Sequence, residues 1–256
     1  MSRPERSFRT DAVILRRQDF GEADRLLVLF TPGYGKLRAI AKGVRKPIAR
    51  NTGHVELFSL VDMQIARGRE LHILTQAETR EPFLPLREDL LRGTYANHVV
   101  ELLDRFGTEL DSSPAEFDLL VNVLGWLTTA SDPRLLARYY EIQLLGLVGF
   151  APDLHYCVLS HEPLEPVDQF FSPADGGVIA PEHRPPDRGM PISLTALKTL
   201  RYMQTQSWEK VQSLKIGPML HLELERLSLS YIIYILEQRL QSVDFLRRLR
   251  RESYEP

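Results

Sequence analysis

Hydrophobic and polar residues alternate along roughly the first 80 positions in short runs that turn residues interrupt. Alternation with a period of two is typical of half-buried β-strands, and turn signals every 8–12 residues or so favour a small barrel or sandwich. The strands that this pattern predicts are Phe8–Arg17, Arg25–Phe30, Lys36–Lys42, Glu56–Ala66 and Leu71–Gln76.

From Pro82 onward the apolar residues recur every three or four positions, which is the spacing of a helix face. This spacing predicts helices at 86–106, from Ser113-Pro114, from Asp132-Pro133 to Gly149, after the cap Ser193, and at 218–240. Eight prolines and a Gly-Gly pair interrupt the pattern at 151–191 and indicate an irregular or two-hairpin insert. We therefore predict an α+β chain with a barrel at 1–80, a helical domain at 81–150 and 192–256, and the insert at 151–191.

Charge is distributed unevenly along the chain. Residues 1–50 contain twelve Lys or Arg against five Asp or Glu, an excess of +7, whereas the rest of the chain carries −9 and the whole chain −2. A basic module on an acidic body points to a polyanion, most often nucleic acid, although a solvated face is the plainer alternative. Five strands within about 75 residues fit an OB-fold, a partly open barrel that binds oligonucleotides.

Signatures of catalysis and of membrane insertion are missing from the sequence. The chain contains no G-x-S-x-G, G-x-x-x-x-G-K-[ST], G-x-G-x-x-G or H-E-x-x-H motif, so we predict no enzyme and no cofactor. No apolar run reaches the roughly 18–20 residues of a membrane span. The first residues lack the apolar core of a signal peptide, and the single cysteine, Cys157, suits a reducing compartment. We expect a cytoplasmic protein.

The best candidate surface lies on the third predicted strand and the basic loop that follows it. Lys36, Arg38 and Lys42 share one alternation parity, which places them on one face of the strand. Such cations can neutralise a phosphate backbone. Tyr34 either stacks on a base or packs on the barrel rim. The predicted nucleic-acid contacts are Arg16, Arg17, Arg25, Tyr34, Lys36, Arg38, Lys42, Arg45, Lys46 and Arg50.

Several strings of residues resemble one protein family. GEADRLL at 21–27, LFTPGYGK at 29–36 and AKGVRK at 41–46 resemble the N-terminal OB domain of RecO, a bacterial recombination mediator. RYYEIQLLGLVGF at 138–150 resembles the central helix of that family, and LQSVDFL at 240–246 resembles its C-terminal ending. The resemblance covers nearly the whole chain in the expected order.

The resemblance implies a role in recombinational DNA repair through the RecF pathway, at the nucleoid and without covalent chemistry. RecO proteins bind single- and double-stranded DNA and anneal complementary strands. They also act with RecR so that RecA can load onto strands coated by single-strand-binding protein. The alternative is another OB-fold protein that acts on structured RNA.

The family also binds the acidic, Phe-ending tail of single-strand-binding protein in an apolar pocket of the helical domain. Such a pocket needs a cation for the terminal carboxylate beside apolar walls. Arg138, at the family's motif position, is the first candidate and Arg201 the second. For Arg138 the alternative is a surface ion pair with Glu141.

One departure from the family pattern concerns zinc. Many relatives carry two Cys-x-x-Cys pairs in the insert, but here these positions read Cys157-Val-Leu-Ser160 and Ala180-Pro-Glu-His183. Because serine and alanine supply no thiolate, we expect a degenerate, metal-free zinc-ribbon-like insert held by apolar packing. A different set, made of His155, Cys157, His161 and His183, stays open as a metal site.

Overall fold

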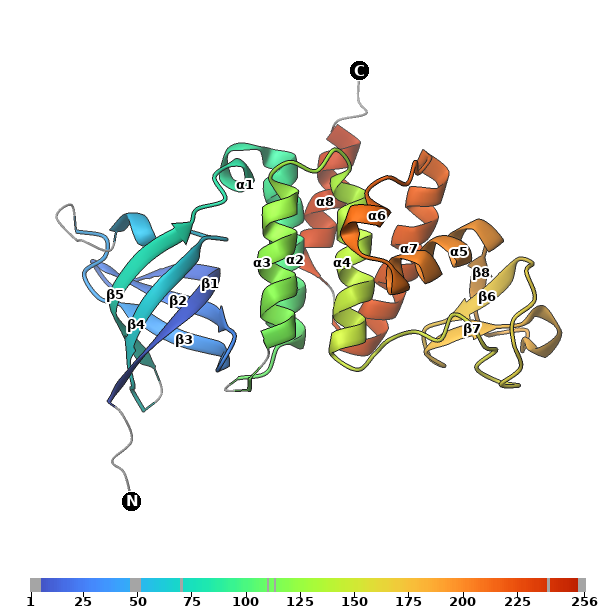
Figure 1. Cartoon of the computed structure of the whole chain (residues 1–256), viewed down its shortest axis with the longest axis horizontal. Helices are drawn as coiled ribbons and strands as arrows, with labels where there is room; N and C mark the ends of the chain where they lie inside the picture. The colour runs from blue at the N-terminus through green and yellow to red at the C-terminus, as the bar shows by residue number, and fades with distance from the viewer. Residues whose placement is uncertain are drawn as a thin grey trace. The chain divides into compact units, whose positions relative to one another are not determined.

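The alternating runs at the start of the chain form a closed five-stranded barrel, which confirms the predicted OB-fold (Figure 1). The computed structural model describes residues 6–46, 52–69, 71–109, 111–112, 114–238 and 240–252. The strands are β1 (Ser7–Phe20), β2 (Asp24–Thr31), β3 (Gly35–Ala41), β4 (Leu60–Ala66) and β5 (His72–Glu81), and the short 3₁₀ helix η1 (Thr52–His54) precedes β4.

Two features of the pairing close the barrel. β1 is long enough to pair with β4 through its first half and with β2 through its second half, and Val13 lies opposite both Leu60 and Phe30. β3 and β5 then pair in parallel, with Ile40 opposite Ile73. Because β4 pairs with both β1 and β5, the strand order β1-β2-β3-β5-β4 leaves no strand as an open edge.

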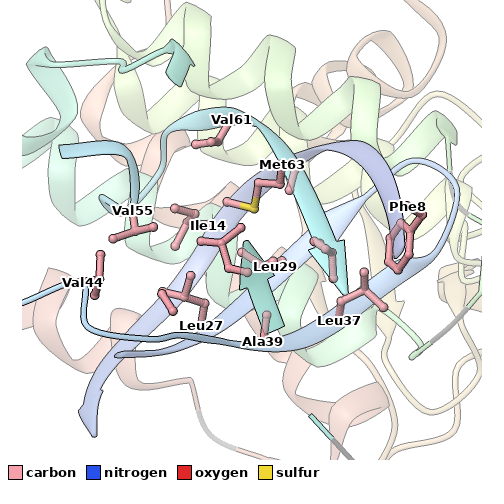
Figure 2. Packing of buried hydrophobic residues seen from close by; sticks show 14 residues of the cluster. Phe8, Ile14, Leu27, Leu29, Leu37, Ala39, Val44, Val55, Val61 and Met63 are labelled. Atoms are coloured by element: carbon pink, nitrogen blue, oxygen red, sulfur yellow. The ribbon is translucent and has the colours of Figure 1, made fainter. Parts of the chain in front are cut away.

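The barrel interior is filled by aliphatic side chains from every strand (Figure 2). Ile14, Leu27, Leu29, Leu37 and Met63 are each at most 2% exposed. Their neighbours along each strand therefore point outward, because side chains alternate between the two faces of a sheet. The interior thus determines which basic residues reach the outer surface.

Three helices follow the barrel in the same compact unit, Met1–Thr129: α1 (Pro85–Glu88), α2 (Leu90–Phe106) and α3 (Pro114–Leu127). The sequence predicted one helix over 86–106, and this prediction was wrong at Asp89. Asp89 is extended, at φ −108° and ψ 120°, and its carboxylate accepts the Arg92 N–H at 2.9 Å as an N-cap. The leucine spacing continues across this break, which is why periodicity alone missed it. The predicted start at Ser113 lies outside the described residues.

The segment after α2 lies against the turn between β2 and β3. The Lys36 N–H donates to the Thr108 carbonyl at 3.1 Å, and Glu109 forms isolated bridges with Gly35 and Lys36. Gly107 sits directly over the buried ring of Phe30, where an added Cβ would lie 3.0 Å from the ring. One end of the outer face of β1–β3 is therefore covered by the chain itself.

The second compact unit, Ala130–Pro256, contains the other helices and a small sheet. The predicted caps Asp132 and Ser193 are confirmed, since their side chains accept the N–H groups of Leu135 and Ala196. The long helix predicted to reach residue 240 ends earlier, because Glu237 adopts a left-handed conformation at φ 51°. The helices are α4 (Pro133–Leu147), α5 (Leu194–Thr205), α6 (Trp208–Val211), α7 (Pro218–Leu236) and α8 (Gln241–Glu252).

Of the two predicted alternatives, an irregular or a two-hairpin insert, the structure matches neither fully, because the insert forms a three-stranded sheet with one hairpin. β6 (Gln169–Ser172) and β7 (Gly177–Ile179) form one hairpin, and β8 (Met190–Ile192) returns to the other edge of β6, so the sheet order is β7-β6-β8. The prolines that suggested irregular chain lie mainly in its connections, including the short 3₁₀ helix η2 (Pro181–His183). None of the described helices has the length and apolar character of a membrane span.

The β2–β3 turn offers a matched test of the docked segment. Gly35 has φ +55°, and an added Cβ would collide with the carbonyl oxygen of Asp111, whereas a Cβ on Gly33 meets nothing within 4 Å. We expect Gly35→Ala to lower the free energy of unfolding by about 2–4 kcal/mol and Gly33→Ala to change it by less than about 0.5 kcal/mol. Urea denaturation of both variants measures the difference, and equal losses would contradict this account of the turn.

Candidate nucleic-acid interface

A row of outward residues crosses β1, β2 and β3 on the outer face of the barrel. Arg16 lies opposite Val28, and Val28 lies opposite Arg38. The side chains of Arg16 and Arg38 are 65% and 62% exposed. Two arginines therefore flank an apolar residue on adjacent strands, which is a suitable arrangement for a phosphate backbone with bases over the middle.

A groove of about 620 Å³ runs along this row. Leu26, Val28 and Leu71 contribute an apolar floor, and Leu71 is partly exposed to solvent. The lining of the groove consists of Arg16, Arg17, Gln18, Leu26, Leu27, Val28, Arg38 and Leu71.

The predicted parity of β3 is confirmed, but its three cations differ in accessibility. Leu37, Ala39 and Ala41 point inward, so Lys36, Arg38 and Ile40 point outward, and Lys42 is exposed just beyond the strand. Lys36 is only 16% exposed and donates to the backbone carbonyl of Asp104 at 2.7 Å. It therefore binds the C-terminal end of α2, where a cation is favoured, and is not open to an incoming strand.

Six of the eight predicted cations that the structure describes form ion pairs. Arg16 and Lys36 share Asp104, and Arg38 pairs with Glu109 at 3.1 Å. Near the open end of the face, where β3 ends, Arg17 and Arg25 share Glu56, and Arg25 and Arg45 share Asp19. Arg17 lies opposite Leu27 and Arg25 opposite Ala41, so both have inward parity and do not belong to the outer row. Lys42 and Lys46 are exposed and make no ion pair among the described residues. Arg50 lies outside those residues.

Sequence reasoning missed these acidic partners. Asp104 is 88 positions from Arg16, and Glu109 is 71 positions from Arg38. No local pattern links residues so far apart, and on the sequence these carboxylates looked like part of a solvated surface. Only the docking of the end of α2 and of the segment that follows it on the barrel brings these residues together.

Two of the segments that resemble the family, 21–27 and 41–46, contact each other in the folded barrel. The carboxylate of Asp24 accepts the N–H of Gly43 at 2.7 Å, and the N–H of Arg45 donates to the carbonyl of Ala23 at 2.9 Å. The turn before β2 thus holds the loop after β3. This contact positions Lys42 and Arg45 at the open end of the face.

The ring of Tyr34 packs against other side chains of the barrel. Its ring lies 4.3 Å from the ring of Phe8, and the Arg67 guanidinium lies over both rings, 4.7 Å from Phe8 and 5.5 Å from Tyr34. Of the two alternatives for this residue, the geometry matches packing on the barrel rim. A base could stack on Tyr34 only after these contacts opened.

The second unit places Arg138 in its interior. Its side chain is 3% exposed and bonds Glu141 at 2.6 Å, so the ion pair with Glu141 exists but lies in the core and not on the surface. The Nε and Nη1 atoms of Arg138 are buried and have no hydrogen-bond partner among the residues that the structure describes. A buried guanidinium with two unsatisfied donors is unusual and calls for an explanation.

Arg201 is occupied by a structural contact. Its Nε donates to the carbonyl of Leu154 at 2.6 Å, and Gln204 from the same helix donates to the carbonyl of Pro152. Burial lowers the pKa of Arg201 below its ordinary value. Arg201 therefore attaches the start of the insert to α5, and this weakens its case as a carboxylate-binding residue.

The residues at the four positions where the family pattern has zinc-binding cysteines do not fit a metal. The Sγ of Cys157 accepts the Ala180 N–H at 3.4 Å and packs in a small apolar cluster with Ile179. His183 instead pairs with Glu162 at 3.4 Å. Across the part of the chain that the structure describes, no three His, Cys, Asp or Glu residues lie close enough to hold a metal ion. The open set of His155, Cys157, His161 and His183 is therefore not assembled here.

Comparisons with known proteins agree along the whole chain. The family model described as recombination protein O, N terminal, matches residues 1–83, and the model for its C terminal part matches residues 87–244. The chain is 36% identical to the DNA repair protein RecO of Dehalococcoides mccartyi over 250 residues, 98% of each chain. It is 39% identical to that of Roseiflexus over 247 residues, 96% of this chain and 87% of the relative.

The geometry of the insert predicts that it folds without zinc. Purified protein should contain far less than one zinc per chain, and a chelator should leave the melting temperature unchanged, because Ser160 and Ala180 offer no thiolate. Elemental analysis and thermal unfolding with and without the chelator measure both quantities. One tightly bound zinc per chain would overturn the prediction.

Proposed function

We propose that this chain, which belongs to the RecO family of DNA repair proteins, binds single- and double-stranded DNA on the outer face of β1–β3. The observation that carries the proposal is the row Arg16–Val28–Arg38, in which two exposed arginines flank an apolar floor on an OB barrel. Lys42, Arg45 and Lys46 extend this surface at its open end.

The same surface suits annealing of complementary strands. Annealing requires that two polyanions approach each other and that every base is tolerated, and cations beside an apolar groove meet both needs without reading sequence. The residues of the groove include no group that chemistry on DNA would require, such as a nucleophile or metal ligand. The proposed activity is therefore binding and pairing, without covalent steps.

Family membership supports the wider role. We propose that the protein works in the cytoplasm at the nucleoid, with RecR, so that RecA can load onto single strands coated by single-strand-binding protein. In this scheme the barrel contacts DNA and the second unit contacts the coat protein. Each contact can be tested separately.

Arg138 is the proposed anchor for the tail of single-strand-binding protein. Its two unsatisfied donors suit a terminal carboxylate. Tyr139, the next residue of α4, lies 5.5 Å from the ring of Trp208 in α6, a helix that contacts α4. Because Arg138 is buried, the tail must displace the side chains that cover the guanidinium. Arg201 is the second candidate, through its buried and unpartnered Nη2.

Charge reversal on the barrel tests the DNA site. Arg38→Glu with Lys42→Glu should weaken binding to all DNA sequences and reduce the salt slope by about 0.7–0.9 per lost contact. Lys36 is left intact because it holds α2 to the barrel. Fluorescence anisotropy with labelled single strands, duplexes and a structured RNA hairpin measures affinity over a salt series.

The matched control is Lys198→Glu with Lys215→Glu, the same change in net charge at exposed residues of the second unit. It should leave the salt slope unchanged. Equal losses in both double variants would move the DNA site away from the barrel. Tighter binding to the RNA hairpin than to DNA would favour the structured-RNA alternative.

The tail site needs a different design, because Arg138→Ala leaves Glu141 buried without its cation and should destabilise the fold by about 3–5 kcal/mol. Arg138→Met with Glu141→Leu replaces both charges by apolar groups and should keep the fold. This pair should weaken binding of an acidic peptide that ends in Phe by about ten- to a hundredfold. Calorimetric titration measures the affinity.

Arg134→Met, on the same helix, is the control for loss of one positive charge, and it should change peptide affinity by less than about twofold. DNA binding should be unaffected in both proteins. Unchanged peptide affinity in a folded Arg138→Met, Glu141→Leu protein would remove Arg138 from the proposed site.

A further inference from the structure

The proposed DNA surface is partly neutralised by the chain's own carboxylates. Asp104, at the end of α2, lies 3.2 Å from Arg16 and 3.5 Å from Lys36, and Glu109, in the segment that follows, lies 3.1 Å from Arg38. These two carboxylates therefore reach both arginines of the row across β1–β3. We call Asp104 and Glu109 the acidic latch.

We propose that the acidic latch determines which polyanions the barrel accepts, an inference that rests on the proposed function. A phosphate that binds Arg16 or Arg38 competes with a carboxylate for the same guanidinium group. A free nucleotide offers few charges in exchange, whereas a polynucleotide brings many phosphates and releases its condensed counterions. The latch thus favours continuous strands over nucleotides and short oligonucleotides.

Glu109 is not needed to hold the segment in place, whereas Asp104 also pairs with the largely buried Lys36. Main-chain carbonyls already dock the segment, because the Thr108 carbonyl accepts the Lys36 N–H and the Asp104 carbonyl accepts the Lys36 ammonium. The two arginines are more than half exposed, so their ion pairs contribute little to stability. A structural role for the carboxylates would therefore leave DNA binding unchanged when they are neutralised.

Neutralising the latch should increase affinity and salt dependence together. In the native protein, binding frees a carboxylate, which attracts cations from solution and offsets part of the counterion release from DNA. Without the carboxylate this offset disappears. The logarithmic salt slope should therefore become steeper, by up to about one for each carboxylate removed.

The experiment compares Asp104→Asn and Glu109→Gln with Glu88→Gln in the full chain. Glu88 is an exposed carboxylate of α1 that forms no ion pair among the described residues. The probes are labelled oligothymidine strands of about 8 and 30 nucleotides, and ATP as a competitor. Each latch variant should bind the long strand about two- to fivefold more tightly at low salt, bind the short strand with a larger gain, and become more sensitive to ATP. Glu88→Gln should match the native protein.

A double-mutant cycle identifies the cause of any gain. Asp104→Asn should lose its gain when Arg16 is also changed to Gln, because its other partner, Lys36, is only 16% exposed and is not open to DNA. Glu109→Gln should lose its gain in the Arg38→Gln background, because Glu109 pairs with Arg38. A gain in DNA affinity that persists in these backgrounds would reflect net charge alone and would contradict the proposed role of the latch. Glu109 is 52% exposed, so Glu109→Gln provides the test even where Asp104→Asn disturbs the end of α2.

The latch and the DNA site can fail independently. If Arg38→Glu with Lys42→Glu weakens DNA binding but the latch variants match the native protein in affinity and slope, the site stands and the latch is wrong. If charge reversal has no effect, the DNA site is elsewhere and the proposed function fails at the barrel.

Discussion

The basic face depends on one contact, in which the start of β3 packs against the end of α2 and the segment that follows it. Lys36 joins the two elements through its N–H and its ammonium group, and Gly35 makes the approach possible because its backbone is left-handed and it has no Cβ. This contact covers one end of the outer face and brings Asp104 to Arg16. The accessible cations of the barrel are therefore those that this docking leaves uncovered.

The arginines of the two units form ion pairs in different environments. On the barrel, arginines form exposed ion pairs that salt and competing anions can weaken. In the second unit, Arg138 is paired inside the core, where ions in solution have little access. The proposed DNA contact should therefore respond strongly to ionic strength, whereas the proposed peptide contact should respond weakly.

The sequence predicted those features that depend on local pattern. Alternation located all five barrel strands, and the caps Asp132 and Ser193 marked two helix starts, because caps and pleats involve residues close in the chain. The break at Asp89 was missed because leucine spacing continues across it. The burial of Arg138 and the acidic partners of Arg16 and Arg38 were also missed, because they arise from contacts between distant segments, and periodicity carries no information on these.

The parallel pairing of β3 with β5 also affects when the barrel can close during synthesis on the ribosome. The barrel cannot close until His72–Leu74 has emerged to pair with Ala39–Ala41, a separation of some thirty residues that makes closure slow compared with the hairpins. Asp104 and Glu109 emerge later still. A nascent chain thus passes through a stage in which the arginine row is complete and its carboxylates have not yet been made. During that interval Arg16 and Arg38 lack the carboxylates that pair with them in the finished protein, beside a ribosome rich in RNA.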